Sequence, residues 1–81
     1  MARVEKLVQS MRRNPRGDWT IDDVRSICRA YTIDCEAPTR GSHYSLKHPQ
    51  IAGRLTIPAR RPIKPIYILL LLDMLDTLEP Q

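Results

Sequence analysis

The 81-residue sequence predicts a small α+β domain in which helices cover one face of a three-stranded antiparallel sheet. Two stretches with helical periodicity come first, a region of alternating apolar and polar residues follows, and an apolar helical stretch comes last. The alternating region contains two runs joined by a short loop with proline and glycine, which is the pattern of an antiparallel hairpin. The length allows one domain, residues 1–81, and a content of 42% hydrophobic and 27% charged residues is typical of a globular chain.

The first two helices have the clearest local signals. A helix is expected over residues 2–13, where apolar residues recur at helical spacing: Val4, Leu7, Val8 and Met11. The second helix is expected from Thr20 to about Tyr31, because Thr20 and Asp23 have the spacing of a capping box. Trp19 and Val24 flank this cap at the positions of a hydrophobic staple, which predicts a structural role for the tryptophan.

The middle of the chain predicts the sheet. An irregular edge strand is expected within residues 34–40, since Pro38 is compatible only with an edge. Alternation predicts a hairpin of residues 43–47 and 54–57, and a last helix is expected from Pro65 to about Leu78. With the helices on one face, the other face stays in solvent. The side chains expected on that open face are His43, Ser45, Lys47, Arg54 and Thr56.

The charge is unevenly distributed along the chain. The net charge is +4, and residues 39–64 contain six Lys and Arg with no Asp or Glu, so this stretch supplies more than the whole net charge. A continuous acid-free basic stretch favours binding of a polyanion, because each phosphate contact needs a base without a competing carboxylate. The alternative is an ordinary solvated basic face.

The expected open face has the side chains for phosphate chemistry. A histidine such as His43 can take a proton from a ribose 2′-hydroxyl or give one to a leaving oxygen. Lys47 and Arg54 are expected to hold a phosphodiester, and Ser45 and Thr56 to donate hydrogen bonds to it. These roles need no metal and no cofactor, and none is expected. Cys28 and Cys35 fit neither a disulfide framework nor a zinc site and are expected to be small apolar residues in a reducing compartment.

One series of residues resembles a known family. Residues 41–49 are Gly-Ser-His-Tyr-Ser-Leu-Lys-His-Pro, residues 55–58 are Leu-Thr-Ile-Pro, and a basic proline-rich linker then precedes the last helix. This series, within residues 21–78, closely resembles the HicA toxins, small ribonucleases of bacterial type II toxin–antitoxin systems. The resemblance implies a fold like that of double-stranded-RNA-binding domains, α-β-β-β-α over residues 18–78, with residues 1–17 as an extra N-terminal helix and turn.

The resemblance also implies an activity and a partner. The protein would be a bacterial cytoplasmic toxin and mRNA endonuclease, with His43 as the catalytic histidine, neutralised by a HicB-type antitoxin in a common oligomer. Many relatives have a second histidine just after the proline of the third strand, where this chain has Ala59-Arg60, so a second proton-transfer group is not assigned. The expected RNA contacts around His43 are Ser42, Ser45, Lys47, Arg54, Thr56, Arg60, Arg61 and Lys64.

Several alternatives remain open at this stage. The same basic face would serve a non-catalytic RNA-binding module, and an adaptor protein with an apolar docking helix is a third interpretation. The N-terminal helix either extends the core or contacts RNA through Arg12, Arg13 and Arg16. Leu69 and Leu72 lie off the expected core stripe of the last helix, so either the N-terminal helix covers them or they face an antitoxin or a second copy of the toxin. The longest apolar run, residues 66–72, is too short to span a bilayer, so no membrane association is expected.

Overall fold

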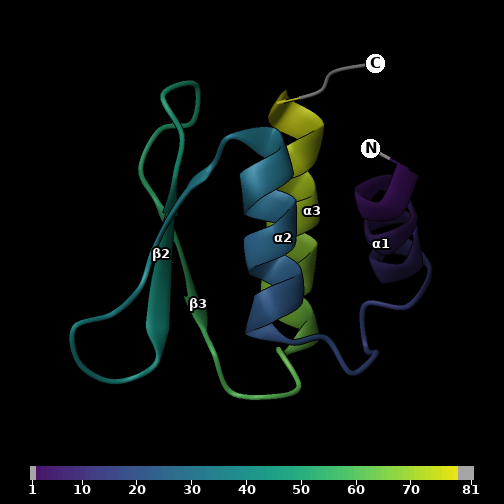
Figure 1. The fold of residues 1–81 in the computed structure, drawn as a ribbon, viewed down its shortest axis with the longest axis horizontal. Coiled ribbons are helices and arrows are strands. Elements are labelled where there is room, and N and C mark those ends of the chain that lie inside the picture. The colour runs from purple at the N-terminus through teal and green to yellow at the C-terminus, as the bar shows by residue number, and fades with distance from the viewer. Residues whose placement is uncertain (1, 79–81) are drawn as a thin grey trace.

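The computed structural model describes residues 2–78, and these residues form an α+β domain (Figure 1). Its elements are α1 (Ala2–Arg13), α2 (Ile21–Tyr31), β1 (Asp34–Glu36), β2 (His43–Lys47), β3 (Leu55–Pro58) and α3 (Pro65–Leu78). The strands form an antiparallel sheet in the order β1-β2-β3, with β2 in the centre. The predicted architecture, α-β-β-β-α after an additional N-terminal helix, is confirmed.

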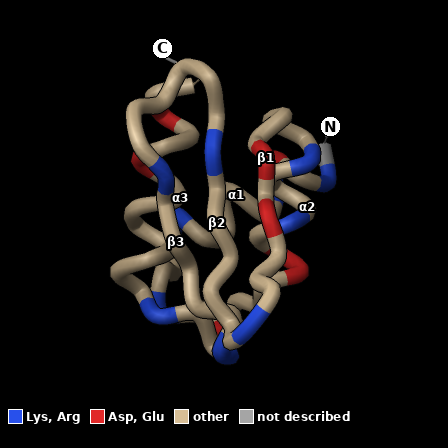
Figure 2. Tube along the Cα trace, turned by 90° about the vertical axis from the view of Figure 1, so that its left-hand side faces the viewer, with Lys and Arg blue, Asp and Glu red and all other residues tan. Residues whose placement is uncertain are grey.

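The elements stack in three layers. The sheet forms the first layer, α2 and α3 lie side by side against one of its faces, and α1 lies on the far side of these two helices (Figure 1). No helix within residues 2–78 covers the other face of the sheet, and Figure 2 looks onto this open face. Because α1 is separated from the open face by the helical layer, it extends the core and does not share a surface with His43. Arg12 of α1 instead forms an ion pair of 2.6 Å with Asp76 of α3.

The ends of α2 follow from the local sequence. The Thr20 hydroxyl accepts a hydrogen bond from the Asp23 N–H at 3.2 Å, and the Asp23 carboxylate accepts one from the Thr20 N–H at 3.0 Å. This reciprocal capping box satisfies two N–H groups that have no partner inside the helix. The indole N–H of Trp19 donates to the Asn14 carbonyl at 2.8 Å, and its ring packs against the core. The structural role predicted for Trp19 is confirmed.

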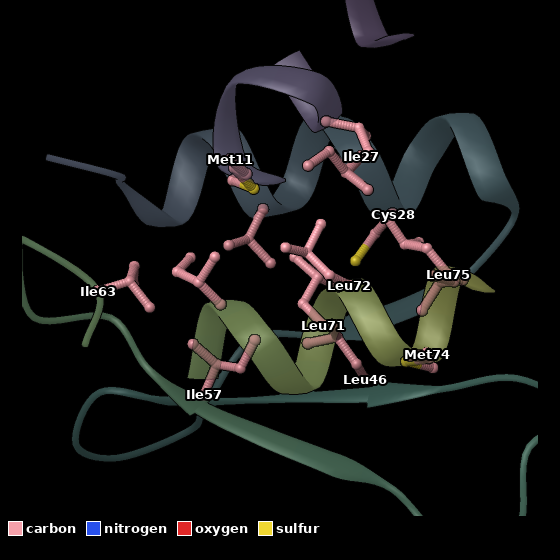
Figure 3. Packing of buried hydrophobic residues seen from close by; sticks show 14 residues of the cluster. Met11, Ile27, Cys28, Leu46, Ile57, Ile63, Leu71, Leu72, Met74 and Leu75 are labelled. Carbon is pink, nitrogen blue, oxygen red and sulfur yellow. The ribbon is translucent and has the colours of Figure 1, made fainter. Parts of the chain in front are cut away.

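All three layers contribute to a single core (Figure 3). Met11 of α1, Ile27 of α2 and Leu46 and Ile57 of the sheet have no exposed surface. From α3 the buried residues are Ile68, Leu71, Leu72, Met74 and Leu75. This set is wider than the single stripe that helical periodicity predicts, because the sheet covers α3 on one side and α1 covers it on another.

The two leucines that the sequence left undecided therefore separate. Leu72 is only 5% exposed and belongs to the core, so of its two alternatives the antitoxin-facing position is wrong. Leu69 is 51% exposed. Ile66, about one helical turn before it, and the next residue, Leu70, are exposed as well.

Two strand boundaries differ from the prediction. β1 covers only Asp34–Glu36, and the chain is a loop from Ala37 to Ser42, where Pro38 has no N–H to offer the sheet. β3 begins at Leu55 and includes Pro58, so Arg54 lies just before the strand.

No helix within residues 2–78 has the length and apolar character that a membrane span requires.

Candidate functional site

The candidate site is built on the central strand. In β2 the Leu46 side chain is fully buried, whereas His43, at the start of the strand, is exposed. Pairing with β3 places Thr56 opposite Ser45 and Pro58 opposite His43. Since side chains alternate across a strand, His43, Ser45 and Thr56 share the open face, as the alternation predicts.

Strand β1 adds carboxylates to this face. Pairing of β1 with β2 places Asp34 opposite Lys47 and Glu36 opposite Ser45. Both acidic residues are exposed, and Figure 2 shows their strand in red beside the central one. The open face is therefore mixed in charge, although residues 39–64 are free of acids in the sequence. The count of charge along residues 39–64 leaves out these two residues, and the pairing of β1 with β2 places them on the open face.

The sequence grouped Lys47 and Arg54 with His43, but in the structure only Arg54 reaches toward it. Lys47 lies four residues further along β2, which at about 3.3 Å per residue is about 13 Å from His43. Lys47 is therefore not brought together with His43, and its cross-strand partner in β1 is Asp34. Arg54 behaves differently, because its guanidinium donates to the Ser45 hydroxyl at 3.4 Å. Arg54 thus reaches back to a position about 7 Å along the strand from His43.

A second group of cations lies at the His43 end of the sheet. The Ala59 N–H donates to the Ser42 carbonyl, which joins the end of β3 to the residue before His43. From there the linker carries Arg60, Arg61 and Lys64 to the start of α3. Basic segments gather at this end of the sheet in Figure 2. Both loops at the His43 end of the sheet, residues 37–42 and 59–64, contain no acidic residue.

One of these cations is already paired. Arg61 donates two hydrogen bonds to the carboxylate of Asp18, at 2.9 Å from Nε and 2.7 Å from the terminal nitrogen. The hydrogen bonds from Arg61 hold the pKa of Asp18 below its usual range. Within residues 2–78, Arg60 and Lys64 have no ion pair, so they remain available for an external anion.

The remaining candidate groups have structural positions. His48 lies at the opposite end of β2 from His43, and its Nδ1 accepts a hydrogen bond from the Gln50 N–H at 3.1 Å in the hairpin loop. Burial is the main cause that raises the pKa of the Cys28 thiol to about 12, so this thiol stays protonated and is a poor nucleophile at neutral pH. In the part of the chain that the structure describes, no group of three or more His, Cys, Asp or Glu side chains has the arrangement of a metal site.

Comparison with known proteins found no matching family model, no matching characterised protein and no matching solved structure. The interpretation of the site therefore depends on its own geometry. That geometry combines an exposed imidazole, a neighbouring carboxylate and hydroxyl, and cations on both sides. These are the groups that general acid–base chemistry on a phosphodiester needs.

Proposed function

We propose that this protein is an endoribonuclease that cleaves mRNA without a metal ion and uses His43 as a general acid or base. The observation that carries the proposal is the place of His43, exposed on the face of the sheet opposite α2 and α3. Arg54 approaches it from one side through Ser45, and the linker cations lie on the other. A phosphodiester bound at His43 would therefore lie between two groups of cations, on a sheet face that solvent reaches.

The proposed reaction is attack by the ribose 2′-oxygen on the adjacent phosphorus. A base removes the 2′-hydroxyl proton, the new P–O2′ bond forms, and the P–O5′ bond breaks. An acid gives a proton to the departing 5′-oxygen, so the products are a 2′,3′-cyclic phosphate and a 5′-hydroxyl. Charge that develops on the phosphoryl oxygens is stabilised by the Arg54 guanidinium, whose fork of N–H donors fits phosphate oxygens.

Glu36 is the candidate for the second proton-transfer group. Through its pairing with Ser45, Glu36 lies diagonal to His43 on the open face. Diagonal cross-strand positions are about 7–8 Å apart, which leaves room for a phosphate between the two side chains. Attack and departure take place on opposite sides of phosphorus, so an acid and a base that flank the phosphate suit the reaction. A Glu36→Gln variant keeps the side-chain shape and should lose cleavage rate while it retains RNA binding.

The resemblance to HicA toxins extends the proposal to a biological role. The protein would act as a bacterial toxin in the cytoplasm and would be neutralised by a HicB-type antitoxin in a common oligomer. The exposed apolar residues Ile66, Leu69 and Leu70 are the proposed antitoxin-facing surface, in place of the pair Leu69 and Leu72.

Two histidine variants test the nuclease proposal. His43→Ala should lower the cleavage rate of a labelled RNA by about 10²–10⁴-fold, which is the usual contribution of a positioned acid or base. The protein should remain folded and should still bind RNA, because His43 is exposed. His48→Ala is the matched control and should keep the activity. Addition of EDTA should leave the rate unchanged, and induced expression of His43→Ala should not stop bacterial growth.

The outcomes separate the alternatives. A folded His43→Ala protein with full activity would disprove the catalytic assignment. If the unaltered protein binds RNA with the same affinity as His43→Ala and cleaves none, the non-catalytic RNA-binding module is the correct interpretation.

A further inference from the structure

A cavity of about 460 Å³ lies at the His43 end of the sheet. Its walls come from four parts of the chain, namely the residue before β2, the last residue of β3, the β3–α3 linker and the first turn of α3. The lining residues are Ser42, Pro58, Arg60, Arg61, Pro62, Lys64 and Tyr67. Ser42 precedes His43 in the chain and Pro58 is the cross-strand partner of His43, so the cavity adjoins the proposed catalytic residue.

The lining combines two kinds of surface. Arg60 and Lys64 supply positive charge that no carboxylate within residues 2–78 neutralises. Two prolines and the half-buried ring of Tyr67 supply apolar surface. Within residues 2–78, the Tyr67 hydroxyl has no hydrogen-bond partner. A ligand that satisfies both surfaces has an anionic group and a flat apolar part.

The β3–α3 linker, which forms one wall of this cavity, is held in place by contacts with the loop before α2. The Ile63 N–H donates to the Trp19 carbonyl at 2.9 Å, and Ile63 itself is 1% exposed. The Asp18–Arg61 ion pair fixes the linker to the same loop before α2. The linker therefore presents Arg60 and Lys64 from an anchored segment, which lowers the entropy lost when they bind an anion.

We propose that this cavity binds one nucleotide of single-stranded RNA, next to the phosphate at His43. Arg60 and Lys64 hold the phosphate of this nucleotide, and its base packs against the ring of Tyr67. The inference rests on the proposed ribonuclease function for its choice of RNA, but it concerns binding and not cleavage. A pocket for one base beside the reacting phosphate would give the enzyme a preference at that position of the RNA.

The test uses a fluorescent hexanucleotide of 2′-O-methyl RNA, which lacks the attacking hydroxyl and stays intact whether or not the protein is a nuclease. Tyr67→Leu should weaken its binding by about 5- to 150-fold, the range for loss of a stacking aromatic side chain. Tyr67→Phe should bind like the unaltered protein, because the ring remains. Lys64→Ala should weaken binding, whereas Lys6→Ala, which removes the same charge from the exposed face of α1, should not. Melting temperatures verify that each variant is folded.

A scan with abasic residues identifies the bound base. At one position of the hexanucleotide, loss of the base should weaken binding about as much as Tyr67→Leu, and the two changes together should cost no more than one alone. Additive losses at every position would overturn the proposal, as would a Tyr67→Leu protein that binds normally or an unaltered protein that does not bind the probe. Failure of the nuclease proposal shows itself separately, as retained cleavage of ordinary RNA by His43→Ala.

Discussion

Arg54 and Lys47 provide a sharp test of the site geometry, because both are basic and both belong to the hairpin. Their surroundings differ in the structure. The Arg54 guanidinium lies at the Ser45 hydroxyl, 3.4 Å away, whereas Lys47 lies about 13 Å along the strand from His43 and opposite Asp34. If the reaction takes place at His43, we expect Arg54, rather than Lys47, to contact the phosphoryl oxygens in the transition state.

The expected effects follow from that difference. Arg54→Ala should lower the cleavage rate at saturating protein by about 10²–10³-fold, the usual loss when one transition-state hydrogen-bond donor is removed. Lys47→Ala should change this rate by less than about fivefold, since a solvent-screened contact contributes up to ~1 kcal/mol. Lys47→Ala should instead raise the protein concentration that is needed for the half-maximal rate. Arg54→Lys should recover part of the rate, because a lysine keeps the charge but not the fork of donors.

The assay is single-turnover cleavage of an end-labelled RNA, followed over a range of protein concentrations. Circular dichroism of both variants controls for folding. Equal losses of saturated rate in Arg54→Ala and Lys47→Ala would refute the geometric argument and place the reacting phosphate nearer the hairpin loop.

Three further predictions concern stability and binding. Leu72→Ala should lower the free energy of unfolding by ~2–5 kcal/mol in urea titrations, because a 5% exposed leucine leaves a cavity, whereas Leu69→Ala should change it by about 0.5 kcal/mol or less; equal effects would contradict the assigned burial. If four phosphates are neutralised, log K for single-stranded RNA should fall with log salt with a slope of about −3, and Lys64→Ala should flatten this slope by about 0.7; a salt-independent affinity would argue against phosphate contacts. Because Arg61 lowers the pKa of Asp18, the charged carboxylate stabilises the folded protein at pH values above the ordinary pKa of aspartate. This stabilisation is lost as the pH falls through the lowered pKa of Asp18. The melting temperatures of the unaltered protein and Asp18→Asn should therefore converge in acid, and a constant difference would exclude this linkage.

The helices and the hairpin could be predicted from the sequence because their signals are local. The capping box of Thr20 and Asp23 fixes where α2 begins, and both its hydrogen bonds are present in the structure. Alternation in residues 43–47 likewise predicts which side chains face the core, since a strand allows only two faces. Such signals need only the geometry of one element.

The composition of the site depends on how elements are placed beside one another, and there the sequence was insufficient. Glu36 enters the open face through the pairing of β1 with β2, and a charge count along residues 39–64 does not include it. The cavity with Tyr67 arises because the linker brings the start of α3 close to the start of β2 and the end of β3. Leu72 was ambiguous for the same reason, since helical periodicity does not reveal that two layers cover α3.

The third layer explains how so small a domain leaves a whole sheet face in water. A sheet of three short strands with helices on one side buries little apolar surface, and an 81-residue chain has a small margin of stability. α1 adds a second buried interface behind α2 and α3, with Met11 fully buried and Val8 5% exposed. The core therefore grows away from the sheet. The open face of the sheet can therefore carry the polar side chains of His43, Glu36 and Arg54, which a covering helix would have to desolvate.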